Sequence, residues 1–291
     1  MTRPAFLNKL LNDPPPRFAF EISAAGIAVA RAAKPPQIGF RPLEPDVVSV
    51  SPVQDNILRM EALTEQVRAL APPGEKKRQR AALILPDHSV RVSVLDFDAF
   101  PPEAQQQLQL VRFRIKKSLP FDVDSAGISY FAQPNGKRTD VVVAAAPLEI
   151  LGRYEMPFRA AGFDPGLVTT SMLCALELVR DGSVCLVAKL SGNALTLAVL
   201  EAGTVKLLRS IELSGGGVEE IASHLYPTFA YMEDQFGRRP QEVLTCGFGR
   251  WNEDLAAEIH ESCVPLRSRY GLPGQFDAGL LGYLERQEEF A

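Results

Sequence analysis

The chain has 291 residues, of which 46% are hydrophobic, and this is enough to form one large hydrophobic core or two smaller ones. The formal net charge of −4 gives no overall positive field, so we expect neither nucleic-acid binding nor direct insertion into an anionic membrane. The four cysteines form no C-x-x-C pair and have no histidine at zinc-ligand spacing, so we expect free thiols in a reducing cytoplasm and no metal site.

The first 80 residues begin with a pattern typical of short strands. Apolar residues alternate over 17–32, which predicts a hairpin, and residues 37–43 predict a third strand. Further apolar residues recur at the three- and four-residue spacing of a helix: Ile57, Met60, Leu63, Val67 and Leu70. We therefore expect three strands followed by a helix, with Asp55 or Asn56 as its N-cap.

A different pattern starts at Ala81 and indicates an inserted unit. Its predicted elements are a strand over 81–86, a strand over 90–97, a helix over 101–118, and two strands over 127–133 and 140–146. The last two strands are joined at Asn135-Gly136, a pair that favours the positive φ of a tight turn. A helix over 147–161 then contains Pro157 and ends at Gly162.

The second half of the chain repeats the outline of the first. Residues 184–213 again predict strand, tight turn, strand, turn and strand, and residues 189–191 can be laid over residues 21–23 with the flanking apolar positions in register. A repeat at about half the chain length indicates two related lobes. The predicted division is a first lobe over 1–80, an inserted strand-helix-strand-strand subdomain with the return to lobe one over 81–167, and a second lobe over 168–291.

Two lobes of this kind, with an insertion in the first, resemble the actin-like ATPase superfamily. The chain is most similar to the PilM-like proteins of type IV pilus assembly, and secondarily to the FtsA cell-division proteins. The segments that carry the resemblance are 110–131, with its helix and Leu-Pro-Phe corner, 148–179, with its helix and crossover, and 184–222, with its hairpin and Gly-rich helix start. The resemblance implies a two-lobed α/β fold of the ribonuclease H-like type.

The resemblance also implies where a nucleotide would bind, and the residues there are altered. In the superfamily, ATP lies between the lobes against two hairpins of approximate pattern Asp-x-Gly, which order Mg²⁺ and approach the phosphates. Here the corresponding residues are Glu21 and Ser23 in one hairpin and Lys189 and Ser191 in the other, with Gly192 one position later. A lysine cannot ligate Mg²⁺, so we expect no hydrolysis and no cofactor, with ATP and Mg²⁺ as the alternative.

Glycines that resemble the family's nucleotide-base loops are retained. They are Gly215, Gly216 and Gly217 before a helix, and Gly247 and Gly249 after a strand. Glycines at turns more often serve backbone geometry than a ligand, so nucleotide binding at these loops stays a minor alternative.

The charges of the two hairpins suggest a substitute for the nucleotide. We expect Glu21 and Lys189 to face each other across the space between the lobes. If they pair, the salt bridge replaces the metal and nucleotide as the clamp between the lobes.

A partner is also implied by the resemblance. PilM-like proteins hold the short cytoplasmic N-terminal tail of a PilN-like inner-membrane protein in a groove between the first lobe and the inserted subdomain, and other pilus platform proteins are further expected partners. We place candidate contacts on the helix and corner over 103–121: Arg112, Ile115, Leu119 and Phe121. Apolar pockets of this kind supply affinity for an extended or helical peptide.

The sequence therefore predicts a non-catalytic scaffold, a pseudo-ATPase, in the platform that supports type IV pili and twitching motility. No stretch approaches the ~18 apolar residues of a membrane-spanning helix, so we expect a cytoplasmic protein held at the inner membrane by its partner. Two alternatives remain open: the cytoplasmic scaffold of type II secretion known as the L protein, and an active ATPase or kinase of the same superfamily.

Overall fold

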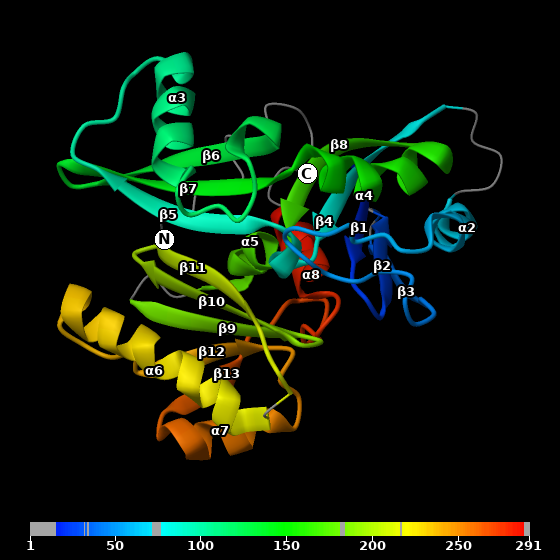
Figure 1. The fold of residues 1–291 in the computed structure, drawn as a ribbon. Helices are drawn as coiled ribbons and strands as arrows, with labels where there is room; N and C mark the ends of the chain where they lie inside the picture. The colour runs from blue at the N-terminus through cyan, green and yellow to red at the C-terminus, as the bar shows by residue number, and fades with distance from the viewer. Residues whose placement is uncertain are drawn as a thin grey trace.

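The computed structural model describes residues 16–31, 33, 35–71, 77–180, 184–215 and 217–287. Within these residues, two five-stranded sheets form the centres of two lobes, and a three-stranded sheet forms an inserted subdomain beside the first (Figure 1). The two-lobed α/β fold with an insertion, as predicted from the sequence, is confirmed.

The first sheet contains the predicted N-terminal hairpin. Its strands are β1 (Phe18–Ile22), β2 (Gly26–Arg31), β3 (Gln37–Pro42), β4 (Gln79–Leu85) and β8 (Phe163–Thr170), in the order β3-β2-β1-β4-β8. Ser23 closes the hairpin turn, because its hydroxyl donates to the Gly26 carbonyl at 2.9 Å and accepts from the Gly26 N–H at 3.1 Å. The side chain of Ser23 thus has a structural role in the turn.

Two helices, α2 (Met60–Leu70) and α4 (Leu148–Ala160), pack on one face of the first sheet. Pro157 lies inside α4, as predicted. The predicted N-cap of α2 is wrong, because the helix begins at Met60. Asp55 instead accepts a hydrogen bond from the Ile57 N–H at 2.9 Å, and the buried Asn56 accepts one from the Tyr154 hydroxyl at 2.9 Å. These polar side chains stabilise a turn and its contact with α4 rather than the start of a helix.

The inserted subdomain has the sheet order β5-β7-β6. Its elements are β5 (Arg91–Phe97), α3 (Ala104–Ile115), the 3-10 helix η2 (Val123–Ser125), β6 (Ala126–Asn135) and β7 (Arg138–Pro147). Asn135 pairs with Arg138 across the turn, and Gly136 has a φ of 60°. The predicted hairpin is therefore confirmed, but its turn is Gly136-Lys137, because Asn135 is still paired in β6. Helix α3 packs through Val111 and Ile115 against the sheet.

The second sheet repeats the topology of the first. Its strands are β9 (Cys185–Ser191), β10 (Ala194–Glu201), β11 (Thr204–Glu212), β12 (Glu242–Cys246) and β13 (Ser262–Pro265), in the order β11-β10-β9-β12-β13. Helices α6 (Gly217–Phe236) and α7 (Trp251–Ile259) pack on it. In both sheets three consecutive antiparallel strands are followed by two parallel ones. The two lobes thus have the common topology that the sequence repeat predicted.

The closing helix α8 (Ala278–Gln287) returns to the first lobe, where it packs against α5 (Ser171–Ala175) and strands β1 and β2 (Figure 1). Gly282 permits this approach, since a Cβ at this position would lie 2.0 Å from the Cys174 carbonyl oxygen. The side chains on this face of the sheet include several alanines, which are small enough for the helix to approach closely. Among the helices described, none combines the length and apolarity that crossing a membrane requires.

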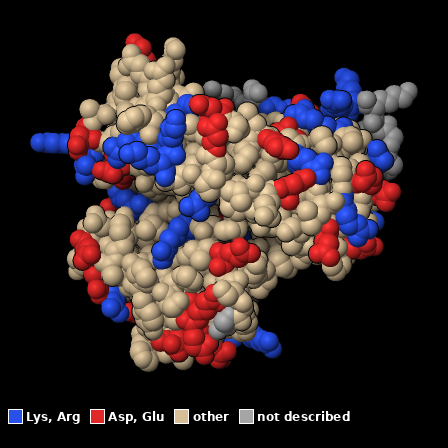
Figure 2. Space-filling model, viewed as in Figure 1, with Lys and Arg blue, Asp and Glu red and all other residues tan. Residues whose placement is uncertain are grey.

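The lobes also meet through the inserted subdomain. Gln133 on β6 exchanges two hydrogen bonds of 3.0 Å with the backbone of Val205 on β11. Lys206 pairs with Asp140 at 2.9 Å, and both side chains are largely buried. Figure 2 shows the surface hollowed between these two parts of the molecule, where residues of β5, β11 and α6 line a polar groove of about 730 Å³. The inserted subdomain is therefore fixed to the second lobe as well as to the first.

Candidate functional site

A buried salt bridge joins the two lobes at the hairpins. Lys189 lies near the end of β9, a strand with neighbours on both sides, and its Nζ donates to Oδ2 of Asp87 at 3.0 Å. Asp87 belongs to the 3-10 helix η1 (Asp87–Ser89), which follows β4 directly. The side chains are only 1% and 5% exposed. Lys189 and Glu21 lie close enough for their charges to interact, but the anion that pairs directly with Lys189 is Asp87, so the salt bridge considered for Glu21 is not formed.

Charge balance explains why this lysine tolerates burial. Burial opposes the charged ammonium, but the carboxylates of Asp87 and Glu21 outweigh that effect and raise the pKa of Lys189 above its ordinary value. The other oxygen of Asp87 accepts the Met172 N–H at 2.6 Å and so satisfies a backbone donor in the first turn of α5. Asp87 thus connects β4, α5 and the second lobe.

Glu21 connects the first hairpin to two helices instead. Its Oε1 accepts a hydrogen bond from the Ser171 hydroxyl, and its Oε2 accepts the Leu280 N–H at 2.7 Å. Burial raises the pKa of Glu21 to about 7, although the Lys189 charge and these two hydrogen bonds act in the opposite direction. Glu21 therefore holds α5 and α8 against β1, and its protonation is expected to change near neutral pH.

This shift gives a testable pH dependence. The pKa of Glu21 rises from 4.5 to about 7 on folding, so between these values the folded protein binds the proton more tightly than the unfolded chain. On account of this group, the free energy of unfolding is expected to fall by about 3 kcal/mol from pH 4.5 to pH 7. Glu21→Gln, which can still accept from Leu280 and bond Ser171, should remove that part of the pH dependence. Urea unfolding at pH 5 and pH 8 measures it, and an identical pH profile for the variant and the native protein would contradict the assignment.

The space between the hairpin turns is small. Its volume is about 50 Å³, enough for a few water molecules, and its walls include the predicted residues Ser23, Ser191 and Gly192 with Asp87 and Phe276. Lys189 and Glu21 are not among the residues that line this space, and their charged groups are hydrogen-bonded to Asp87 and to Ser171 and Leu280, respectively. Among the described residues no group of three or more His, Cys, Asp or Glu side chains is placed to hold a metal ion. As the hairpins stand, this space is too small for a magnesium-bound triphosphate, and the expected absence of a nucleotide stays a prediction.

The retained glycines have backbone explanations. Gly192, Gly215, Gly217, Gly247 and Gly249 all have positive φ, the left-handed conformation that side chains disfavour. At Gly247, a Cβ would also lie 2.2 Å from the Leu190 carbonyl oxygen. Gly216 lies outside the described residues. The role of these glycines in binding a nucleotide base stays a prediction.

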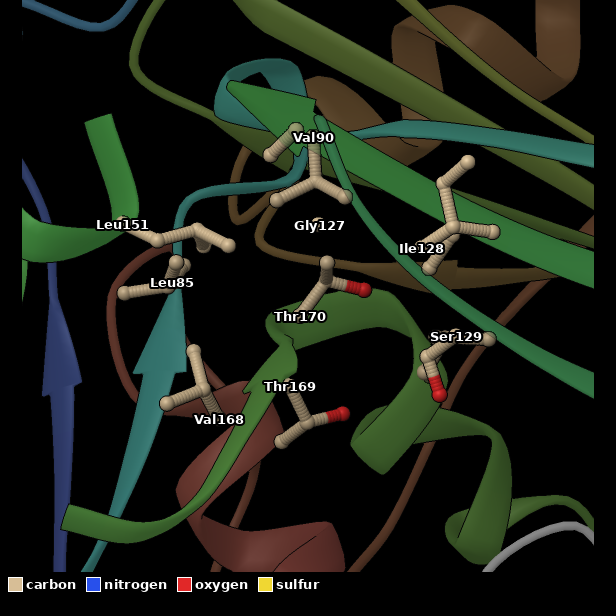
Figure 3. Close-up of a pocket in the computed structure, with 12 residues that line it drawn as sticks. Leu85, Val90, Gly127, Ile128, Ser129, Leu151, Val168, Thr169 and Thr170 are labelled. Carbon is tan, nitrogen blue, oxygen red and sulfur yellow. The ribbon is translucent and has the colours of Figure 1, made fainter. Parts of the chain in front are cut away.

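An apolar pocket lies where the inserted subdomain meets the first lobe (Figure 3), and we call it the junction groove. Its volume is about 270 Å³. Its lining residues come from four strands, two helices and the turn before β5: Leu85, Val90, Gly127, Ile128, Ser129, Ala144, Ala146, Leu151, Val168, Thr169, Thr170 and Leu173. Chain segments that are distant in sequence therefore form one apolar recess with few polar groups, as binding pockets commonly do.

The predicted partner contacts on α3 and in the corner that follows it lie elsewhere, and none of the four lines the junction groove. Ile115 is 1% exposed and belongs to the core of the inserted subdomain, so it offers no surface to a partner. Arg112 donates to the Val123 carbonyl at 2.7 Å and holds the start of η2. Leu119 and Phe121 are half-buried against the same core. The partner role of Arg112, Leu119 and Phe121 stays a prediction, whereas burial argues against one for Ile115.

Sequence reasoning missed Asp87 and Thr170, although each left a signal. A lone lysine inside the apolar strand "CLVAKLS" requires a buried anion, because an unpaired charge is too costly to bury. Asp87 directly follows the apolar strand "AALILP", so it was a candidate for that anion. Thr170, at the end of β8, belongs to the polar run 169–171, which directly follows the apolar pair Leu167-Val168. No local pattern, however, indicates which distant segment either side chain meets.

Comparison with known proteins identifies the fold. No protein-family model and no curated protein matches the sequence. Among solved structures, a chain of the PilM-PilN type IV pilus biogenesis complex aligns with a TM-score of 0.77 and 16% identity, over 94% of this chain and 99% of that chain.

Two further structures align less closely. One is the cytoplasmic domain of EpsL, an inner-membrane component of the Vibrio cholerae type II secretion system, with a TM-score of 0.53, 12% identity and 94% coverage of each chain. The other is a Bacteroides thetaiotaomicron protein of unknown function with an actin-like ATPase fold, with a TM-score of 0.53, 10% identity, and coverage of 92% of this chain and 96% of that chain. The chain therefore has the actin-like ATPase fold, in the form that it shares with the PilM-PilN pilus complex.

Proposed function

We propose that this chain is a non-catalytic scaffold of a type IV pilus assembly platform, and that its junction groove binds the cytoplasmic N-terminal tail of a PilN-like membrane protein. The observation that carries the proposal is the groove itself. It is apolar and preformed, and it lies between the first lobe and the inserted subdomain, where the resemblance to PilM-like proteins implies a tail-binding site. The full-length similarity to a chain of a PilM-PilN complex supports the same role.

The non-catalytic part of the proposal rests on the space between the lobes. Among the described residues of the two hairpins, the carboxylates of Asp87 and Glu21 are both engaged by protein partners, which argues against a role for them as Mg²⁺ ligands. The protein would then act through binding alone, on the cytoplasmic face of the inner membrane, where the partner's membrane anchor retains it.

The test is a titration of the full chain into a fluorescent peptide that carries the N-terminal tail of a PilN-like protein from the same organism. We expect a saturable rise in anisotropy, which an unlabelled tail reverses and a scrambled tail does not. A calorimetric titration with ATP and Mg²⁺ should give no binding heat. Failure of the tail to bind would overturn the partner, and saturable Mg²⁺-dependent ATP binding would overturn the non-catalytic role.

A scaffold of type II secretion is the second candidate, favoured by the similarity to the EpsL cytoplasmic domain over 94% of both chains. We rank it second because the TM-score of that match is lower, 0.53 against 0.77. The same anisotropy assay separates the two candidates when pilus-type and secretion-type tails compete for the groove, because the tighter competitor identifies the system.

A further inference from the structure

The junction groove is bordered by two open sheet edges. Strand β6 is the last strand of the inserted sheet, and β8 is the last strand of the first sheet. Residues 127–129 of β6 and residues 168–170 of β8 line the groove consecutively. Because successive side chains point to opposite faces of a sheet, a pocket that meets three consecutive residues meets the edge of the strand and its backbone.

The register of the β6–β7 hairpin shows which backbone groups face this edge. Its two-residue turn makes Asn135 and Arg138 a hydrogen-bonded pair, so every second residue back along β6, including Ser129, bonds to β7. The intervening positions form no hydrogen bonds across the hairpin. Pro134 and Pro147, which have no N–H to donate, both fall at such positions, as this register requires. Ile128 also occupies one of these intervening positions. Its N–H and C=O therefore point out of the sheet at the groove.

Thr170 supplies an independent observation. Its hydroxyl oxygen is buried and has no hydrogen-bond partner among the described residues, although the residue is only 2% exposed. Figure 3 shows its side chain projecting into the pocket, with the hydroxyl oxygen on the side of Ile128 and Ser129. An unpaired buried hydroxyl is costly, so a site that contains one is suited to a ligand with a polar group at that point.

The reason that Thr170 is free is visible in the fold. Thr170 is the N-cap of α5, where a threonine hydroxyl ordinarily accepts a backbone N–H of the first turn, but it makes no such bond. Asp87 accepts the Met172 N–H instead. Asp87 therefore caps α5 in place of Thr170, and the Thr170 hydroxyl stays available to a ligand in the groove.

We propose that the groove binds its partner as an added β-strand, in which an extended peptide pairs with the Ile128 backbone and bonds the Thr170 hydroxyl. A peptide backbone provides both donors and acceptors at the strand spacing that these groups require, and alternate apolar side chains would contact Leu85, Leu151 and Leu173. A helix satisfies its own backbone and would leave Ile128 and Thr170 unpaired. The inference rests on the proposed function, because it specifies how the partner tail is held.

The first test uses two buried threonines, one that lines the groove and one that does not. Thr170→Val removes the free hydroxyl and is expected to weaken tail binding about tenfold, the usual effect of one hydrogen bond, while the thermal unfolding midpoint stays the same or rises. Thr64→Val is the matched control, because Thr64 is also a buried threonine of the first lobe, does not line the groove, and has a hydroxyl that donates to the Met60 carbonyl at 2.7 Å. Its affinity for the tail should not change. Equal affinities for the native protein and Thr170→Val would overturn the role of Thr170.

The second test measures whether the backbone N–H of Ile128 becomes hydrogen-bonded when the tail binds. In amide exchange followed by NMR, the Ile128 N–H should exchange quickly in the free protein and at least tenfold more slowly with the tail bound, whereas the Ser129 N–H is protected in both. N-methylation of single residues along the tail should abolish binding at every second position. A bound tail that leaves Ile128 unprotected, or that tolerates every N-methyl group, would show that the added-strand mode is wrong.

A third arm separates this inference from the proposed function. Random 12-residue peptides displayed with free N-termini are selected on the full chain, and the selected peptides are assayed as above. Suppose that the native tail does not bind, but that selected peptides protect the Ile128 N–H from exchange and lose binding when every second residue is N-methylated. The added-strand mode is then supported, and the proposed partner is wrong. If the tail binds but neither protects the Ile128 N–H nor shows the two-residue period in N-methylation, the proposed partner is supported and the added-strand mode is wrong. Selection that yields no peptide at Ile128, together with a tail that fails to bind, overturns both.

Discussion

Replacing Lys189 with methionine is expected to lower the free energy of unfolding by about 3–5 kcal/mol, because the change leaves the Asp87 carboxylate buried without its cation. Methionine keeps most of the volume of the lysine stem, so the loss reports the charge rather than a cavity. Urea unfolding of both proteins at pH 7, followed by circular dichroism, measures the difference.

Two further variants make this result specific. Arg59→Met breaks an exposed pair with Glu44 at a similar distance, 2.8 Å, and should change the free energy of unfolding by no more than about 0.5 kcal/mol. The double variant Asp87→Asn with Lys189→Met has no unpaired charge at this point and should regain much of the loss. If Lys189→Met costs no more than Arg59→Met, the salt bridge is not the clamp between the lobes.

Placing valine at Gly127 is expected to reduce the affinity for the partner tail at least ~100-fold, because the new side chain enters the narrow groove and blocks the edge of β6. A Cβ at this position would lie 2.9 Å from a methyl of Leu151 and 3.2 Å from one of Leu148. Both are flexible ends of side chains, so we expect the variant to fold. Anisotropy with the labelled tail measures the affinity.

The matched control is Gly39→Val, on the exposed edge strand β3. There a Cβ would meet only a methyl of Val29, at 3.5 Å. This variant also replaces a strand glycine by valine but should leave tail affinity unchanged. Gly127→Val with native affinity and a native melting temperature would place the tail somewhere other than the junction groove.

Local patterns predicted most of the elements. Alternation and the Asn-Gly turn gave the hairpin of β6 and β7, and the half-chain repeat indicated two lobes of equal topology. The start of α2 was predicted wrongly, because Asp55 and Asn56 have the composition of an N-cap but use their side chains in a turn and in a contact with Tyr154. Composition alone does not distinguish these uses.

The site was less predictable because its contacts join distant segments. The sequence indicated that Lys189 needs an anion, but its partner Asp87 is 102 residues away, and Glu21 occupied the aligned position in the other hairpin. The junction groove depends on residues from several elements, and none of these residues has an unusual local pattern. The free hydroxyl of Thr170 is visible only once Asp87 is seen to cap α5.

The Lys189–Asp87 salt bridge has a consequence for how such a scaffold responds to the cell. Where a diffusible nucleotide closes two lobes, the angle between them follows the cell's supply of ATP and the rate of hydrolysis. Here the closing charges are part of the chain itself, and Asp87 lies between Leu85 and Val90, two walls of the groove. If the proposed non-catalytic role holds, the groove is expected to keep one shape in starved and growing cells alike, and assembly would then depend on the amount of partner rather than on metabolic state.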